Sequence, residues 1–208
     1  MRNVIFVFII VVLSVCFFTG SFFPSEAQLI GARYPALSPD GTKIAFSYMG
    51  DIWVVSSDGG RAIQLTNNVA YEREPVWSPD GEWLAFSSNR TGNNDIYIIP
   101  AGGGEARQIT FHTGNDIATD FSPDGKWIYF TSSRSSSSSI FKIKVNGGNA
   151  IPVLDTYWSW PYDAKVSPDG LSVLFSLGME NNFKWRRGYK GSNSAKIWIK
   201  RLNKNNAK

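Results

Sequence analysis

The residue types that support nucleophilic catalysis are sparse in this chain. Its 208 residues include one histidine, His112, and one cysteine, Cys16. A hydroxyl or thiol nucleophile needs a base within hydrogen-bond reach, and no G-x-S-x-G sequence is present to expose a serine at a nucleophile elbow. We therefore expect His112 to be a solvated loop residue, and we predict no catalytic residue within this chain.

Metal and cofactor chemistry also lacks its usual residues. A single histidine and a single cysteine cannot build a metal site of the common His or Cys types. Gly102, Gly103 and Gly104 lack the lysine and the following helix of a phosphate loop, so they indicate a turn. Glu72 and Glu74 could form an acid/base pair, but charged loop residues are usually solvated. We expect neither a metal nor a cofactor.

The elements that would position these residues come from a tandem repeat. The sequence SPDG begins at Ser38, Ser78, Ser122 and Ser167. An apolar run precedes each copy, an alternating run follows it, and a third run of branched and aromatic residues comes after a polar loop. Short runs of this kind, bounded by Gly, Pro, Asn or Asp, are typical of β-strands. Four antiparallel strands in each unit of about 42 residues are the signature of a β-propeller blade.

The repeat therefore predicts an all-β chain that forms a β-propeller with four blades. The blades are expected at about residues 33–66, 73–110, 117–154 and 161–202, followed by a basic tail at 203–208. The fourth blade lacks its outer strand. Because a propeller closes with about four to eight complete blades, we expect this one to be incomplete, with further blades in a larger chain.

Strand polarity places the loops on two faces of the propeller. The SPDG turns and the glycine turns fall on one face, here named the turn face. The loops between second and third strands and the blade-to-blade connections fall on the other, the variable face, where binding residues usually lie. Aromatic rings beside arginines can hold an extended peptide. We predict that a peptide or protein partner binds the variable face through Tyr71, Glu72, Arg73, Tyr157, Trp158, Trp160, Arg186, Arg187 and Tyr189, with His112, Asp116, Tyr162 and Lys190 nearby.

Two aromatic sets have structural explanations as well. Trp158 and Trp160 could cap the core instead of binding a partner, and that alternative stays open. The column formed by Trp53, Tyr97, Phe141 and Trp198 could stack on a nucleic acid or a sugar. Since its members share one position in the third strand, we expect them to pack between neighbouring blades.

The N-terminal residues have the pattern of a secretory signal peptide. Arg2 precedes an apolar run, and small residues lead to a cleavage site after Ala27. Cleavage would leave no cysteine and no membrane span, and would place the protein in the periplasm or outside the cell. An uncleaved anchor over residues 4–23 is the alternative. Residues 181–208 hold nine Lys or Arg and no acid. Because export makes nucleic acid an unsuitable partner, we interpret this basic end as solvated or as part of a larger chain.

The repeats resemble the TolB-type, WD40-like propeller family. The segments RYPALSPDGTKIAF at 33–46 and GDIWVV at 50–55 are similar to the start of tricorn-type serine peptidases. The segment KWRRGYKGS at 184–192, which leads to KIWI at 196–199, is similar to a part of the same N-terminal propeller. The likeness covers residues 32–202. It implies a six-bladed N-terminal propeller of a large exported or cell-envelope peptidase.

In that family a second propeller, a PDZ-like module and a catalytic core follow. The core supplies the nucleophilic serine and its base, and no segment of this chain matches it. The resemblance implies that the propeller gates or channels peptides to a buried active site. One alternative is a free-standing periplasmic TolB-like interaction module. Another is a complete propeller enzyme, which is disfavoured because the sequence shows no set of catalytic residues.

Overall fold

The computed structural model describes residues 31–135, 138–154, 161–177 and 196–202. All regular secondary structure within these residues is β-strand, which confirms the all-β prediction. The strands form three four-stranded sheets and one three-stranded sheet, all antiparallel and in chain order. No helix with the length and apolar character needed to cross a membrane occurs in this described part of the chain.

Each sheet is one propeller blade, as the repeat predicts. Blade 1 contains β1 (Arg33–Leu37), β2 (Lys43–Tyr48), β3 (Asp51–Ser56) and β4 (Ile63–Gln64). Blade 2 contains β5 (Glu72–Trp77), β6 (Trp83–Ser88), β7 (Asp95–Pro100) and β8 (Arg107–Gln108). Blade 3 contains β9 (Asp116–Phe121), β10 (Trp127–Ser132), β11 (Ser139–Lys144) and β12 (Ile151–Leu154). Blade 4 contains β13 (Pro161–Val166), β14 (Ser172–Leu177) and β15 (Lys196–Arg201).

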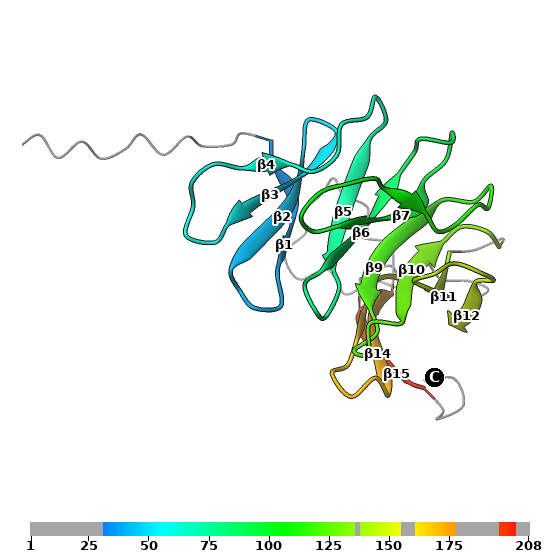
Figure 1. The fold of residues 1–208 in the computed structure, drawn as a ribbon. Helices are drawn as coiled ribbons and strands as arrows, with labels where there is room; N and C mark the ends of the chain where they lie inside the picture. The colour runs from blue at the N-terminus through cyan, green and yellow to red at the C-terminus, as the bar shows by residue number, and fades with distance from the viewer. Residues whose placement is uncertain (1–30, 136–137, 155–160, 178–195, 203–208) are drawn as a thin grey trace, which may run out of the picture. The chain divides into compact units, whose positions relative to one another are not determined.

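The blades pack face to face in chain order (Figure 1). The first strand of each blade lies on the preceding blade: β5 contacts β1, β2 and β3, and β9 contacts β5, β6 and β7. In the same way β13 contacts β9, β10 and β11. The first strands of successive blades are therefore neighbours, which is the arrangement of strands around a propeller axis.

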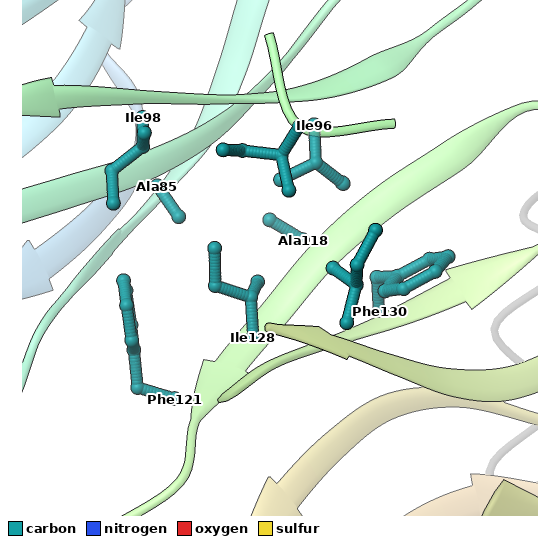
Figure 2. Close-up of a cluster of buried hydrophobic side chains, with 9 residues drawn as sticks. Ala85, Ile96, Ile98, Ala118, Phe121, Ile128 and Phe130 are labelled. Atoms are coloured by element: carbon teal, nitrogen blue, oxygen red, sulfur yellow. The ribbon is translucent and has the colours of Figure 1, made fainter. Parts of the chain in front are cut away.

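The hydrophobic core is divided among the interfaces between blades. Because side chains alternate across a strand, each middle blade offers one apolar face to each neighbour. Leu84 and Phe86 face blade 1, whereas Ala85, which lies between them, faces blade 3. The buried residues labelled between blades 2 and 3 are Ala85, Ile96, Ile98, Ala118, Phe121, Ile128 and Phe130 (Figure 2).

The SPDG turns have the chemistry that their sequence predicts. In the first copy Ser38 Oγ donates to Asp40 Oδ1 at 2.6 Å and accepts from the Lys43 backbone nitrogen at 2.9 Å. Gly41 closes the turn with φ of 73°, in the left-handed region that glycine tolerates best. The other three copies repeat the serine–aspartate hydrogen bond and the positive φ. The turn face is therefore a uniform scaffold.

Blade 4 differs from the other blades in the exposure of its third strand. Ile197 and Trp198 of β15 are 76% and 50% exposed, while Ile140 at the matching position of blade 3 is fully buried. Because side chains alternate across a strand, Ile197 lies on the face away from blade 3, which no sheet covers among the described residues, whereas Trp198 pairs with Phe175 on the face toward blade 3. The expected packing between blades is therefore observed for Tyr97, which is buried, but not for Trp198.

Candidate functional site

The loops of the variable face contact one another, as strand polarity predicts. The backbone nitrogen of Tyr71, in the connection between blades 1 and 2, donates to Asn89 Oδ1 at 2.7 Å. In the next connection the Asn115 backbone nitrogen donates to Ser133 Oγ at 2.8 Å. Each connection thus binds the loop between the second and third strands of the blade that it enters.

A buried ion pair anchors the variable face of blade 2. Glu72, at the start of β5, is fully buried, and Arg90 Nε donates to its Oε1 at 2.7 Å. The Arg90 guanidinium also lies 4.8 Å from the ring centroid of Tyr97 and 5.8 Å from that of Phe86. A guanidinium at these distances makes cation–π contacts with both rings. Arg90 therefore joins the loop, the first strand and the aromatic pair.

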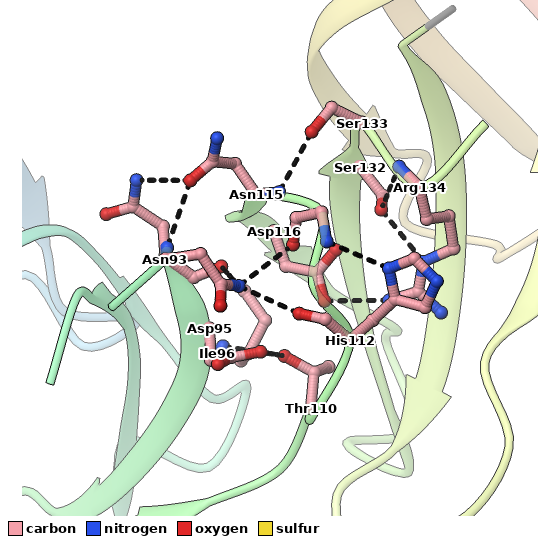
Figure 3. Close-up of polar contacts among 12 residues, drawn as sticks. Asn93, Asp95, Ile96, Thr110, His112, Asn115, Asp116, Ser132, Ser133 and Arg134 are labelled. Carbon is pink, nitrogen blue, oxygen red and sulfur yellow. Dashed lines mark hydrogen bonds and ion pairs between the residues drawn. The ribbon is translucent and has the colours of Figure 1, made fainter. Parts of the chain in front are cut away.

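Blade 3 repeats the same device with other residues. Arg134 Nη2 donates to Asp116 Oδ2 at 2.7 Å, and Asp116 is fully buried at the start of β9 (Figure 3). The Arg134 guanidinium lies 5.1 Å from the Phe130 ring and 4.8 Å from the Phe141 ring. Its Nε donates to Ser132 Oγ at 2.8 Å. Two adjacent blades thus hold their variable loops with an arginine clamped between a buried carboxylate and two stacked rings.

Sequence reasoning missed Arg90 and Arg134. Each stands four residues after the phenylalanine of its second strand, Phe86 or Phe130. This constant offset is the signal that could have identified them.

The third and fourth strands of blades 1 and 2 are tied by a second repeated contact. In blade 1 Thr66 Oγ1 donates to Asp51 Oδ1 at 3.3 Å and accepts from the Ile52 backbone nitrogen at 2.9 Å. In blade 2 Thr110 makes the same two bonds with Asp95 and Ile96. Burial raises the pKa of Asp95, and the hydrogen bonds from Thr91 and Thr110 oppose that rise. Asp51 and Asp95 therefore have structural roles.

His112 belongs to a polar network instead of a nucleophile pair (Figure 3). Its Nδ1 accepts a hydrogen bond from the Gly114 backbone nitrogen at 2.9 Å, and its carbonyl accepts from Asn93 Nδ2 at 2.8 Å. Its Nδ1 is therefore occupied by a contact with the backbone. Within the described residues its side chain has no hydrogen bond to a serine, threonine or cysteine.

Close packing of two loops fixes this network. A Cβ added to Gly114 would lie 2.7 Å from the backbone nitrogen of Arg134, closer than carbon and nitrogen can approach. Glycine is therefore required here for space, and it brings the connection from blade 2 against the Asp116–Arg134 pair.

The first strands β5 and β13 carry bulges at charged residues with left-handed backbone conformations. In β5 the register shifts between Arg73 and Val76, and Glu74 has φ of 57°; in β13 Asp163 has φ of 52°. Burial raises the pKa of Glu74, Asp163 adds to the rise, and Arg73 opposes it. A non-glycine residue in this region is strained, and such strain is common at functional positions.

A trough lined by residues of blade 1 and of its connection to blade 2 opens next to Tyr71, and we name it the blade 1–2 trough. Its volume is about 650 Å³. The lining comes from the start of β1, the turn between β2 and β3, and the connection between β4 and β5. Tyr71 is 42% exposed at its edge. The trough is therefore the hollow on the variable face nearest to a predicted binding residue.

The structure separates the predicted binding residues into three groups. Tyr71 is exposed, whereas Glu72 and Asp116 are fully buried and face their arginines. Arg73 and Tyr162 are half-buried in β5 and β13, and His112 is exposed. Tyr157, Trp158, Trp160, Arg186, Arg187, Tyr189 and Lys190 lie outside the described residues.

Comparison with known proteins identifies the family. A model of the tricorn protease N-terminal beta propeller domain matches residues 31–208. The solved structure of a putative TolB from Agrobacterium tumefaciens is similar with a TM-score of 0.70 and 28% identity, covering 82% of this chain and 62% of that one. The crystal structure of the tricorn protease has a TM-score of 0.64 and 20% identity, covering 84% of this chain and 18% of that one.

Curated relatives match shorter parts of the chain. The uncharacterized peptidase YuxL of Bacillus subtilis is 33% identical over 75 residues, which are 31% of this chain and 11% of YuxL. The chain thus spans only a minor part of this relative and less than two thirds of the TolB structure. With the family model matched from residue 31 to residue 208, the chain belongs to the family of the tricorn protease N-terminal beta propeller domain.

Proposed function

We propose that this propeller binds peptides or a protein partner on its variable face without catalysing a reaction itself. The observation that carries the proposal is the repeated clamp at Glu72–Arg90 and Asp116–Arg134, which stiffens the loops of that face. Preformed loops bind with a smaller loss of conformational entropy than loose ones. Exposed Tyr71 and the blade 1–2 trough supply a contact surface beside the first clamp.

We further propose that the chain acts as the N-terminal, peptide-gating part of an exported tricorn-like serine peptidase. Membership of the tricorn N-terminal family supports this role. The exposed apolar side chain of Ile197 supports the presence of further blades, because Ile52, Ile96 and Ile140, at the equivalent positions of blades 1 to 3, are fully buried. The signal-peptide pattern of residues 1–27 supports export to the periplasm or beyond the cell.

A free-standing TolB-like interaction module is the second candidate. The similarity to the Agrobacterium TolB structure, over 82% of this chain at 28% identity, favours it. Both candidates share the binding face and differ in what surrounds the propeller in the native protein.

Two measurements test these proposals. An antibody raised against the purified chain, used on blots of the producing cells, reports the size of the native protein. A band large enough for a second propeller and a catalytic core supports the peptidase part, and a band near 23.1 kDa supports the free-standing module. Binding is measured by fluorescence polarisation with a library of labelled peptides.

The binding measurement uses variants on the two faces. Replacing both Arg186 and Arg187 with alanine is expected to weaken peptide binding, and Trp158→Ala with Trp160→Ala tests whether these rings bind or cap the core. Arg61→Ala, on the turn face, is the matched control and is expected to bind as the wild type does. Two results would contradict the proposed role of the variable face. One is that no library peptide binds the wild type or any variant. The other is that peptides bind the Arg186/Arg187 variant as tightly as the wild type.

A further inference from the structure

The residues around the blade 1–2 trough include one serine whose hydroxyl is sealed from solvent. Ser47, which lines the trough, is 3% exposed, and its Oγ has no hydrogen-bond partner among the described residues. At the matching position of blade 2, Ser87 Oγ accepts a hydrogen bond from the Ala118 backbone nitrogen at 2.9 Å. Because solvent does not reach Ser47 Oγ, a ligand in the trough cannot bond to it, and the rim residues supply the contacts.

The rim of the trough is apolar and unusually exposed. Met49 is 83% exposed and Val69 is fully exposed, and both line the trough together with Tyr71. Met49 has φ of 52°, a conformation that is unfavourable for a side chain with a Cβ. The turn between β2 and β3 therefore holds the Met49 side chain outward at an energetic cost. Adjacent exposed apolar side chains of this kind mark interaction sites.

The charge of the trough is positive. Arg33 is exposed, lines the trough and makes no ion pair within the described residues. No aspartate or glutamate is among the lining residues. A guanidinium without an acidic neighbour favours a carboxylate, which it can bind through two hydrogen bonds.

We propose that the blade 1–2 trough binds an extended peptide segment at an apolar residue adjacent to an acidic one. The apolar side chain packs on Met49 and Val69, and the carboxylate pairs with Arg33. This inference rests on the proposed function, peptide binding by the variable face. We take the carboxylate to be an internal side chain, and a probe that ends in a free carboxylate distinguishes it from the end of a peptide.

The test measures binding of fluorescein-labelled peptides to the full chain by fluorescence polarisation. The main probe is an acetylated and amidated peptide with Leu-Glu at the centre of a Gly, Ser and Ala sequence. Matched probes carry Leu-Gln or Ser-Glu at the centre, and a fourth lacks the glutamate and ends in a free leucine carboxylate. The wild type is expected to bind the Leu-Glu probe about tenfold more tightly than the Leu-Gln probe, which is the effect of one charge-assisted pair.

Variants on the exposed rim separate the contributions. Arg33→Gln is expected to abolish the preference for Leu-Glu over Leu-Gln, and Val69→Ser the preference for Leu-Glu over Ser-Glu. Arg61→Gln and Ile63→Ser, which replace exposed residues away from the trough, are the matched controls. Circular dichroism confirms that each variant is folded.

Three outcomes overturn the inference. They are an unchanged glutamate preference in Arg33→Gln, tighter binding of the free-carboxylate probe than of the Leu-Glu probe, and binding of Leu-Glu that is insensitive to Val69→Ser. If library peptides bind elsewhere on the variable face under these outcomes, the proposed function stands and only the trough assignment fails. If no peptide binds the wild type, both fail.

Discussion

Replacing Arg90 with alanine is expected to destabilise the propeller through the charge that it leaves behind. Glu72 is fully buried and bonds to Arg90 through Oε1, while its Oε2 has no hydrogen-bond partner among the described residues. The variant therefore removes the main compensation of a buried carboxylate. It also removes the guanidinium from its position over Tyr97 and Phe86.

The magnitude follows from the burial and the distances. Two unit charges about 3 Å apart attract by about 5–6 kcal/mol at an effective dielectric constant of about 20, before any desolvation is counted. Removing one partner of a buried pair costs about 3–5 kcal/mol. Because the Arg90 side chain is 21% exposed, water weakens the pair, and we expect a loss of about 3 kcal/mol in the free energy of unfolding. For a propeller of this size, that corresponds to a fall of about 6–12 °C in the unfolding midpoint.

Urea unfolding followed by tryptophan fluorescence measures the effect, arranged as a double-mutant cycle with Glu72→Gln. Alanine at Arg90 is expected to cost much less in the Glu72→Gln background, because no buried charge is then stranded. Arg61→Ala, an exposed arginine on the turn face, serves as the control and is expected to change stability by about 0.5 kcal/mol or less. A cost below about 1 kcal/mol for Arg90→Ala, or an equal cost in both backgrounds, would refute the clamp.

Two further predictions test the packing and the turns. Gly114→Ala places a Cβ 2.7 Å from the Arg134 backbone nitrogen, so it is expected to lower the free energy of unfolding by more than about 2 kcal/mol in urea. Gly102→Ala, whose Cβ would have no atom within 4 Å, is the control and is expected to be nearly neutral. Equal losses in the two variants would exclude the clash. The Ser38 hydroxyl, helped by Thr42, lowers the pKa of Asp40 to about 2. A carboxylate with a depressed folded pKa stabilises the fold above its unfolded pKa, so the stability difference between wild type and Asp40→Asn is expected to be constant above about pH 4 and to shrink as the pH falls toward 2. An NMR titration in which Ser38→Ala leaves the Asp40 pKa unchanged would contradict this cause.

The sequence predicts the parts of this fold that depend on local order. The SPDG copies specify both the turn geometry at Gly41 and the period of the blades, since their hydrogen bonds join residues that are two to five positions apart. Strand alternation then places the loops on their two faces. These relations are readable from one chain because they involve neighbours in sequence.

The parts that escape prediction depend on distant partners. Arg90 bonds to Glu72, eighteen residues earlier, and nothing in the spacing shows that the carboxylate is buried. Glu72 was expected to contact a partner, and its position under the clamp follows only from the packing of blade 2 on blade 1. The exposure of Ile197 likewise depends on whether another sheet covers blade 4, although its strand resembles the other third strands in sequence.

The blade 1–2 trough and the arginine clamps have a common structural origin. In blades 2 and 3 an arginine from the loop after the second strand occupies the space above the stacked rings and meets a carboxylate at the start of the first strand. In blade 1 that loop is reduced to Met49 and Gly50, and the position that corresponds to Glu72 is Ala32. Both halves of the clamp are thus absent from blade 1, and the trough lies at the same end of the blade. The trough therefore occurs in the blade whose repeat lacks both halves of the clamp.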